Sequence, residues 1–77
     1  MTEVVFPSLS KDRPDAEGVV SLWFVAEGQA VTEGQLLAEV QVDKVSVEVP
    51  APVAGTVHLV VGEDAAVHQG SVIARIE

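Results

Sequence analysis

The side chain best suited to chemistry is that of Lys44, which stands in the stretch Val42-Asp43-Lys44-Val45. Residues on both sides of it alternate between apolar and polar types, and the two alternations mirror each other about the Asp43-Lys44 pair. Such a pattern is typical of two antiparallel strands joined by a two-residue turn. We therefore predict a β-hairpin that presents one primary amine at its tip.

The predicted hairpin has a definite register. Valines pair with valines on one face, and polar residues pair with polar residues on the other. The predicted pairs are Val42 with Val45, Val40 with Val47, Gln41 with Ser46, and Glu39 with Glu48. Asp suits a tight turn because its side chain can bond nearby backbone, whereas Lys has no such advantage. A lysine at this position therefore serves either as a solubilising edge charge or through the chemistry of its amine.

Length and composition limit the class of protein. The 77 residues are expected to form one domain, residues 1–77. A domain of this size buries only about 60% of its unfolded surface, which leaves no room for an enclosed catalytic cavity beside the core. Valine dominates the apolar residues, and the only aromatic residues are Phe6, Trp23 and Phe24. This composition favours strands, so we expect an all-β domain that is not an enzyme by itself.

The net charge and the absence of cysteine limit the classes of binding partner and cofactor that the chain can have. The formal net charge of −8 argues against nucleic acid or an anionic membrane surface and favours a basic surface on another protein. No apolar run is long enough to span a membrane, and the N-terminus has no export signal, so a cytoplasmic location is expected. The chain has no cysteine, so any sulfur redox chemistry must come from an attached cofactor.

The chain also repeats itself. Residues 18–25 match residues 55–61, and residues 31–40 match residues 67–76, with one residue fewer in the second half. Each half is too small to bury its own apolar face, so the halves are expected to pack together about a pseudo-twofold axis. The sequence thus predicts a flattened β-barrel, or sandwich, of two small antiparallel sheets. The second half has no tip lysine, so the scaffold itself does not require one.

The expected elements are strands only. They are residues 4–6, 18–26, 30–31, 36–42, 45–49, 55–61, 66–67 and 71–76. Trp23 and Phe24 are adjacent, so one is expected in the core and the other at the surface. Residues 8–17 are expected to form an exposed loop, in which Lys11 stays unmodified. His58 and His68 have no His or Cys neighbour at ligand spacing, so no metal site is expected.

The tip and its flanks together resemble the lipoyl domains of 2-oxo acid dehydrogenase complexes, of the acyltransferase-component type. The residues that carry the likeness are Glu39-Val-Gln-Val-Asp43-Lys44-Val45, Pro50-Ala-Pro-Val-Ala-Gly55, Glu27-Gly28, Val31 and Gly34. With the internal repeat, the likeness covers residues 5–76 and implies the barrel-sandwich hybrid fold. Two departures are Val45, where Ala is commoner, and a slightly long loop before Gly18. In the family this loop lies near the lipoyl-lysine and helps the decarboxylating component recognise its substrate.

The resemblance implies a lipoyl carrier domain, with lipoic acid amide-linked to Lys44 and with Asp43 and Val45 as flanking recognition residues. Such an arm carries acyl groups and electrons between the components of the complex. The implied partners are a lipoate-protein ligase or lipoyl transferase, a thiamine-diphosphate-dependent 2-oxo acid dehydrogenase component, the acyltransferase core and dihydrolipoamide dehydrogenase. The isolated domain is expected to be monomeric. Asp43 is expected to favour the ammonium form of Lys44, so the ligase would have to supply the deprotonation.

Two alternatives remain open. A biotin carrier domain of a carboxylase shares the fold and the repeat, but such domains typically have Met on both sides of their lysine, where this chain has Asp43 and Val45. An unmodified barrel used for assembly has no need of the Asp-Lys pair at the tip.

Overall fold

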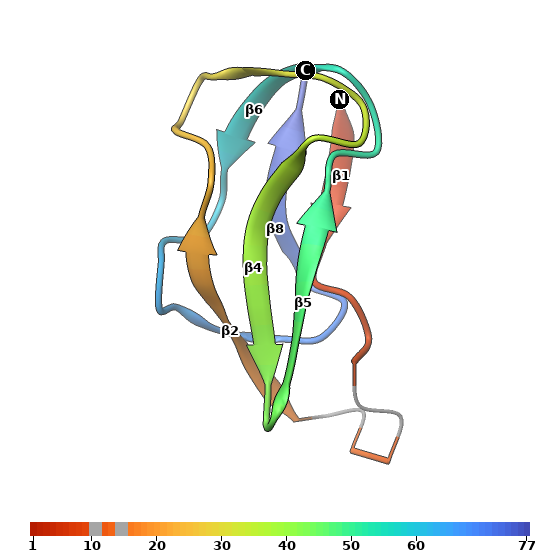
Figure 1. Cartoon of the computed structure of the whole chain (residues 1–77), viewed down its shortest axis with the longest axis vertical. Helices are drawn as coiled ribbons and strands as arrows, with labels where there is room; N and C mark the ends of the chain where they lie inside the picture. The colour runs from red at the N-terminus through yellow and green to blue at the C-terminus, as the bar shows by residue number, and fades with distance from the viewer. Residues whose placement is uncertain (10–11, 14–15) are drawn as a thin grey trace.

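Two antiparallel sheets face each other in the fold (Figure 1). The computed structural model describes residues 1–9, 12–13 and 16–77. The strands are β1 (Thr2–Val5), β2 (Glu17–Trp23), β3 (Ala30–Val31), β4 (Leu36–Val42), β5 (Val45–Pro50), β6 (Gly55–Leu59), β7 (Ala66–His68) and β8 (Val72–Ile76). One four-stranded sheet has the order β1-β8-β6-β3 and the other has the order β5-β4-β2-β7. The predicted all-β architecture of two small sheets is confirmed.

All the predicted strand segments are present, and β3 and β4 have the predicted bounds. β2 and β6 end earlier than predicted, at Trp23 and Leu59. Beyond the end of β2 the regular strand pairing stops, but the backbone still forms a hydrogen bond to β4. The Phe24 amide donates to the Leu37 carbonyl over 2.8 Å. The alternation of apolar and polar residues continues into these loop segments, so a prediction based on it makes the strands too long.

The hairpin of β4 and β5 has the register predicted from the alternation. Its cross-strand partners are Glu39 with Glu48, Val40 with Val47, Gln41 with Ser46, and Val42 with Val45. Val40 and Val42 are fully buried, whereas Glu48 and Gln41 are exposed. The period of two in the sequence therefore sets both the register and the inward face.

Backbone hydrogen bonds confirm the pseudo-twofold repeat. The Gly28 amide donates to the Val57 carbonyl over 2.8 Å, and the Asp64 amide donates to the Val20 carbonyl over 2.7 Å. Gly28 and Asp64 also share a left-handed backbone, with φ values of 80° and 63°. Each half thus places the turn after its first long strand against a strand of the other half.

The structure shows which residue the second half lacks. In β2 the pairing register shifts between Val20 and Leu22, which leaves Ser21 as a β-bulge. Before the bulge Val20 corresponds to Val57, whereas after it Leu22 corresponds to His58. Read position by position from Gly18, the predicted match of residues 18–25 with residues 55–61 pairs Ser21 with His58. That pairing is wrong, because His58 corresponds to Leu22 in the structure. The extra residue bends β2 without disturbing the rest of the repeat.

The core between the sheets is apolar. Its largest fully buried side chains are Phe6, Leu37, Ile73, Ile76, Val20, Val40, Val42 and Val57. Trp23 packs against this core, and its indole Nε1 donates to the Val61 carbonyl over 3.1 Å. Phe24 is 44% exposed, so these two neighbours lie on opposite faces as expected. The described ranges contain no helix of the length and apolarity needed to cross a membrane.

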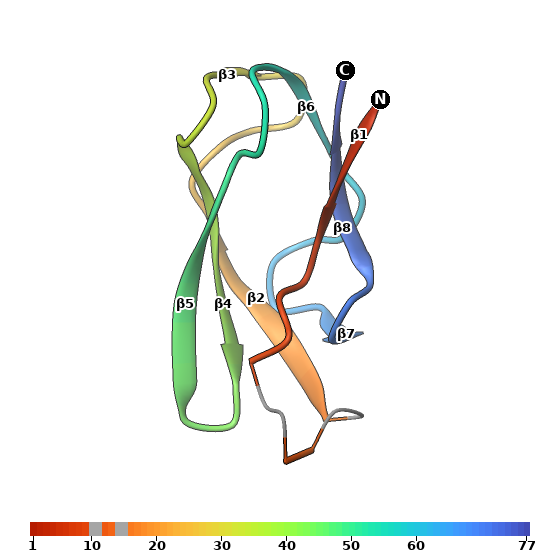
Figure 2. The same cartoon turned by 90° about the vertical axis from the view of Figure 1, so that its right-hand side faces the viewer.

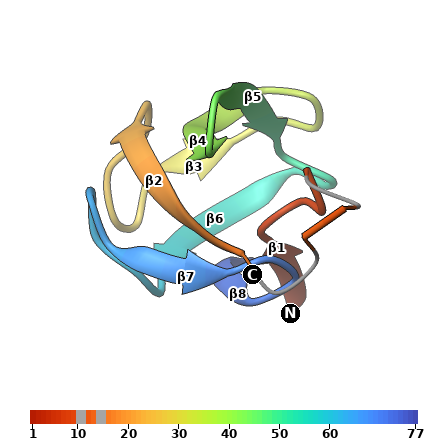
Figure 3. The same cartoon turned by 90° about the horizontal axis from the view of Figure 1, so that it is seen from below.

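The hairpin turn and the chain termini lie at opposite ends of the long axis (Figures 1 and 2). The molecule measures 34 × 19 × 17 Å along its principal axes. Figure 3 looks along the long axis and shows the strands arranged around the core. The tip of the hairpin is therefore the part of the scaffold that projects away from both termini.

Gly18 brings β2 close to the base of this hairpin. A Cβ at Gly18 would overlap the Phe6 ring and lie 2.7 Å from Val42 Cγ2 and 2.8 Å from the carbonyl oxygen of Gln41. We expect Gly18→Ala to lower the free energy of unfolding by about 1–3 kcal/mol, because the backbone oxygen cannot move aside cheaply. Urea denaturation measures this change.

The matched control is Gly62→Ala. A Cβ at Gly62 would meet no atom within 4 Å, so we expect a change of less than about 0.5 kcal/mol. Equal losses in the two variants would contradict the close approach of β2 to the hairpin.

Candidate functional site

Lys44 lies in the turn between β4 and β5, and its side chain is exposed. Among the described residues, none of the ion pairs includes Lys44. The sheet behind it is anchored by the buried Val42, which is 1% exposed. The site thus combines an accessible amine with a rigid support.

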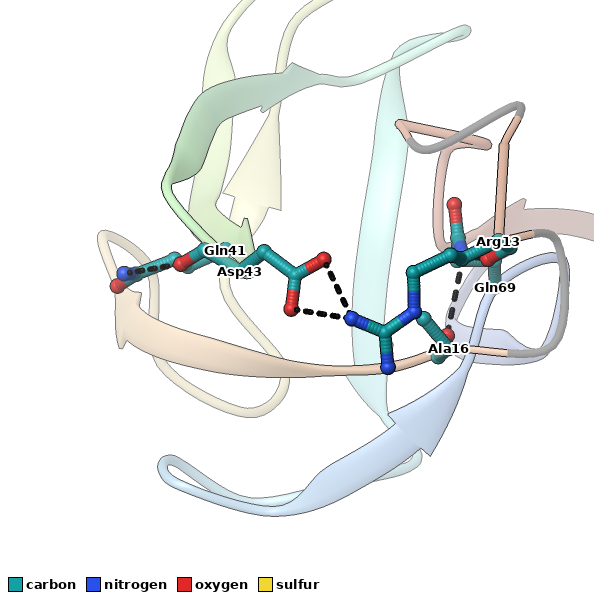
Figure 4. Close-up of polar contacts among 5 residues, drawn as sticks. All are labelled: Arg13, Ala16, Gln41, Asp43 and Gln69. Atoms are coloured by element: carbon teal, nitrogen blue, oxygen red, sulfur yellow. Dashed lines mark hydrogen bonds and ion pairs between the residues drawn. The ribbon is translucent and has the colours of Figure 1, made fainter.

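The turn itself is held by its neighbours. Asp43 has a φ of 53°, a left-handed conformation that Asp tolerates better than most residues. The side-chain amide of Gln41 donates to the Asp43 carbonyl over 3.1 Å (Figure 4). Val45 is 46% exposed and lies directly after the amine. Asp43, Lys44 and Val45 therefore form one exposed surface at the tip.

A further residue at the tip, which sequence analysis did not find, is Arg13. Its Nη1 lies 3.5 Å from Oδ1 and 3.4 Å from Oδ2 of Asp43 (Figure 4). The Arg13 side chain is 67% exposed and the Asp43 side chain is 50% exposed, so solvent screens this ion pair. The pair places Arg13, a residue of the predicted 8–17 loop, beside the tip, where the family resemblance led us to expect this loop. No periodic pattern links residues so far apart in the sequence.

Gln69, in the turn between β7 and β8, holds this loop against the barrel. Its Nε2 donates to the Arg13 carbonyl over 3.2 Å and to the Ala16 carbonyl over 3.0 Å (Figure 4). Its Oε1 accepts from the Leu9 amide over 2.7 Å. The loop is exposed at Arg13, as predicted, whereas Leu9 and Ala16 at its ends are half-buried. Lys11, expected to stay unmodified, lies outside the described residues.

His58 forms a charged group at the other end of the barrel. Its Nδ1 lies 2.7 Å from Glu27 Oε2, and its Nε2 lies 3.3 Å from Glu77 Oε2 without hydrogen-bond geometry. The hydrogen bond to Glu27, and then the Glu77 carboxylate, raise the pKa of His58 above its ordinary value of 6.5. The hydrogen bonds from His58 and from the Leu59 amide lower the pKa of Glu27 below 4.5.

No local pattern in the sequence indicates these partners of His58. The Glu27 carboxylate lies at Nδ1 of His58 and the Glu77 carboxylate lies at Nε2, so a protonated imidazole can pair with both. Within the part of the chain that the structure describes, no three His, Cys, Asp or Glu side chains gather in a way that could hold a metal ion.

Loss of the Gln69 side chain should destabilise the protein. We expect Gln69→Ala to lower the free energy of unfolding by about 1–3 kcal/mol, because it leaves the half-buried Leu9 and Ala16 backbone groups without their partner. The control is Glu33→Ala at the pseudo-twofold equivalent position, where the exposed side chain has no hydrogen bond in the described structure. Thermal unfolding that shows equal losses in both variants would argue against the role of Gln69.

The His58 group should make stability depend on pH in two directions. Because the pKa of His58 is raised on folding, its contribution is full below pH 6.5 and is lost as the pH rises through the folded-state pKa. Because the pKa of Glu27 is lowered, its contribution is present above pH 4.5 and is lost as the pH falls through the folded-state pKa. The contribution of this group to stability should therefore be greatest between these two pH values.

Melting temperatures from pH 3 to 9 can check this dependence, with His58→Gln as the variant and His68→Gln as the control. We expect His58→Gln to flatten the loss of stability above pH 6.5, where the His58 contribution declines. His68→Gln should keep the wild-type profile. A wild-type profile in His58→Gln would contradict the role of the group.

Comparison with known proteins gives consistent matches. A family model described as "Biotin-requiring enzyme" matches residues 2–76. The dihydrolipoyllysine-residue acetyltransferase component of the pyruvate dehydrogenase complex of Corynebacterium glutamicum is 43% identical over 97% of this chain. The component of the same name from Staphylococcus aureus is 47% identical over 79% of this chain. The chain spans only 11% and 14% of the lengths of these two relatives.

A solved structure extends the likeness to the whole fold. The solution structure of the lipoyl domain of the 2-oxoglutarate dehydrogenase complex from Azotobacter vinelandii superposes with a TM-score of 0.80 and 26% sequence identity. The match covers 100% of this chain and 96% of that one. The chain therefore belongs to the biotinyl/lipoyl attachment family, as a lipoyl domain of the type found in acyltransferase components of 2-oxo acid dehydrogenase complexes.

Proposed function

We propose that the chain is a lipoyl carrier domain, in which lipoic acid is amide-linked to Nζ of Lys44. The observation that carries the proposal is the position of this amine. It is exposed at the tip of a rigid hairpin, at the end of the barrel opposite both termini. A scaffold fixed through the other end would leave the tip free to enter the active sites of other proteins.

The residues at the tip fit an attached group of this kind. A modifying enzyme can reach the amine, and no ion pair within the described ranges holds the Lys44 ammonium. When attached, lipoic acid supplies a dithiolane that takes up electrons and an acyl group, chemistry that this cysteine-free chain lacks. The chain's own part is to present the arm and to be recognised by the enzymes that act on it.

Asp43 and Val45 complete the proposed site. Asp43 supports the left-handed turn and offers a carboxylate to the ligase, and the half-exposed Val45 offers an apolar contact on the other side of the amine. We assign the deprotonation of the Lys44 amine to the ligase.

The partners follow from this role. They are a lipoate-protein ligase or lipoyl transferase, a thiamine-diphosphate-dependent 2-oxo acid dehydrogenase component, an acyltransferase core and dihydrolipoamide dehydrogenase. The named relatives make the pyruvate and 2-oxoglutarate complexes the first two parents to test. On this proposal the chain is a shared substrate and not itself a catalyst. Its cytoplasmic location, its monomeric state and its extent as one domain stay predictions.

A biotin carrier domain is the second candidate, because the family description names biotin-requiring enzymes. The residues beside the amine, Asp43 and Val45, favour the lipoyl reading. The third candidate is an unmodified barrel that serves in protein assembly. Such a function would not require an exposed lysine at this tip.

Mass spectrometry can test the site of modification directly. The protein is produced with lipoate and a lipoate ligase, and intact mass and peptide mapping are measured for the wild type and for Lys44→Arg. We expect one lipoyl group on Lys44 of the wild type and none on the variant, because Arg keeps the charge but cannot form the amide. Lys11 provides an internal control that should stay unmodified.

Each contrary outcome points to another reading. A biotinyl group on Lys44 would favour the carboxylase carrier. A chain that stays unmodified would favour the assembly barrel, and a lipoyl group on Lys11 would refute the assignment of the tip.

A further inference from the structure

Comparison of the two pseudo-twofold halves shows which features the barrel fold requires. A feature that is present in only one half is not required by the fold. Eleven residues separate Phe6 from Gly18, whereas three separate their counterparts Ala51 and Gly55. The longer connection therefore has no equivalent in the second half, and neither does the tip lysine. Figure 2 shows the turn between β4 and β5 at the end of the barrel opposite the termini. Arg13 of the longer connection forms an ion pair with Asp43 in that turn. The second half closes without such extra residues, and in the first half the described residue Arg13 lies beside the proposed site.

Arg13 of this loop is fixed at its backbone. Its carbonyl accepts from Gln69 Nε2 over 3.2 Å and from the Ala16 amide over 3.0 Å. Because the backbone is already held, formation of the ion pair costs mainly side-chain entropy and little further backbone entropy. Glu33, the counterpart of Gln69, makes no such bond in the described structure. This support for Arg13 is thus also absent from the other half.

The guanidinium of Arg13 meets the carboxylate that stands next to Lys44. Nη1 lies within 3.5 Å of both Asp43 oxygens. A carboxylate beside an ammonium would otherwise favour the charged, unreactive form of the amine. In the described structure no ion pair joins Asp43 to Lys44. Arg stays charged at every pH at which an amine reacts, so it can hold Asp43 throughout.

We propose that Arg13 is a positioning residue for Lys44: by pairing with the Asp43 carboxylate, it prevents this carboxylate from pairing with the Lys44 ammonium and keeps the amine available for acylation. The biological meaning of this inference rests on the proposed carrier function. The availability of the amine, however, can be measured without lipoate or ligase, so failure of one proposal leaves the other standing.

The probe is the N-hydroxysuccinimide ester of acetic acid, used in trace amounts at pH 8 and low salt on the full chain. Nζ of Lys44 attacks the ester carbonyl, a C–N bond forms, the C–O bond to N-hydroxysuccinimide breaks with its electron pair, and the amine proton goes to solvent. Peptide mapping gives the acetylation rate of Lys44 relative to that of the Met1 amino group at the far end of the barrel. This ratio corrects for reagent concentration.

We expect Arg13→Gln to slow acetylation of Lys44 about two- to fivefold, the range of an exposed ion pair. Arg13→Lys should restore most of the rate, and 1 M salt should abolish the difference. Arg75→Gln is the matched control, because Arg75 forms an exposed ion pair of 4.0 Å with Glu3 on the other sheet. It should leave the rate unchanged. Urea midpoints establish that all variants are folded.

A double-mutant cycle separates action through Asp43 from a direct effect of the Arg13 charge. Asn tolerates the left-handed turn as Asp does, so Asp43→Asn removes the charge and retains the geometry. In the Asp43→Asn background, Arg13→Gln should no longer change the rate. If Arg13→Gln slows acetylation equally in both backgrounds, or in neither, the proposal is wrong.

Discussion

The structure depends on the burial of two small apolar sheet faces against each other. Neither half has enough side chains to form a core alone, and each half also completes the backbone hydrogen bonds of the other. The amide of Gly28 reaches the Val57 carbonyl, and that of Asp64 reaches the Val20 carbonyl. We therefore expect that neither half folds without the other. The hairpin gains its rigidity from this mutual support, since Val40 and Val42 are buried in the shared core.

The repeat also separates scaffold from function. Features common to both halves, such as the left-handed turns and the inward valines, serve the barrel. Features confined to one half gather at two places. Arg13 and the turn that carries Lys44 lie at one end, and His58 pairs with Glu27 and Glu77 at the other. The first end presents the amine, and the second joins Glu77 to β6 through His58, whose charge depends on pH.

The sequence predicted the parts of the fold that follow a period. The register of the hairpin follows from alternation of apolar and polar residues, because a slip of one residue would expose every buried valine. The place of the bulge at Ser21 could not be predicted, since the two halves align almost equally well with the missing residue at several positions. Strand ends were overestimated where alternation continued into loops.

The candidate site was predicted only in part. Asp43, Lys44 and Val45 are consecutive, so any tight turn brings them together, and their chemical role was inferred from a family resemblance. Arg13 and Gln69 were missed because their contacts join segments that are brought together only by the fold. The partners of His58 were missed for the same reason. Local patterns predict local pairing, whereas contacts between loops depend on the whole topology.

Reductive acylation of the lipoylated protein tests the central claim most directly. The protein is incubated with its 2-oxo acid and the thiamine-diphosphate-dependent component of the pyruvate complex, and in parallel with that of the 2-oxoglutarate complex. The mass of the Lys44 peptide is then measured. A carrier should gain one acyl group on the reduced lipoyl arm at Lys44 with one of these components. A lipoylated Lys44 that neither component acylates would contradict the proposed role in these complexes.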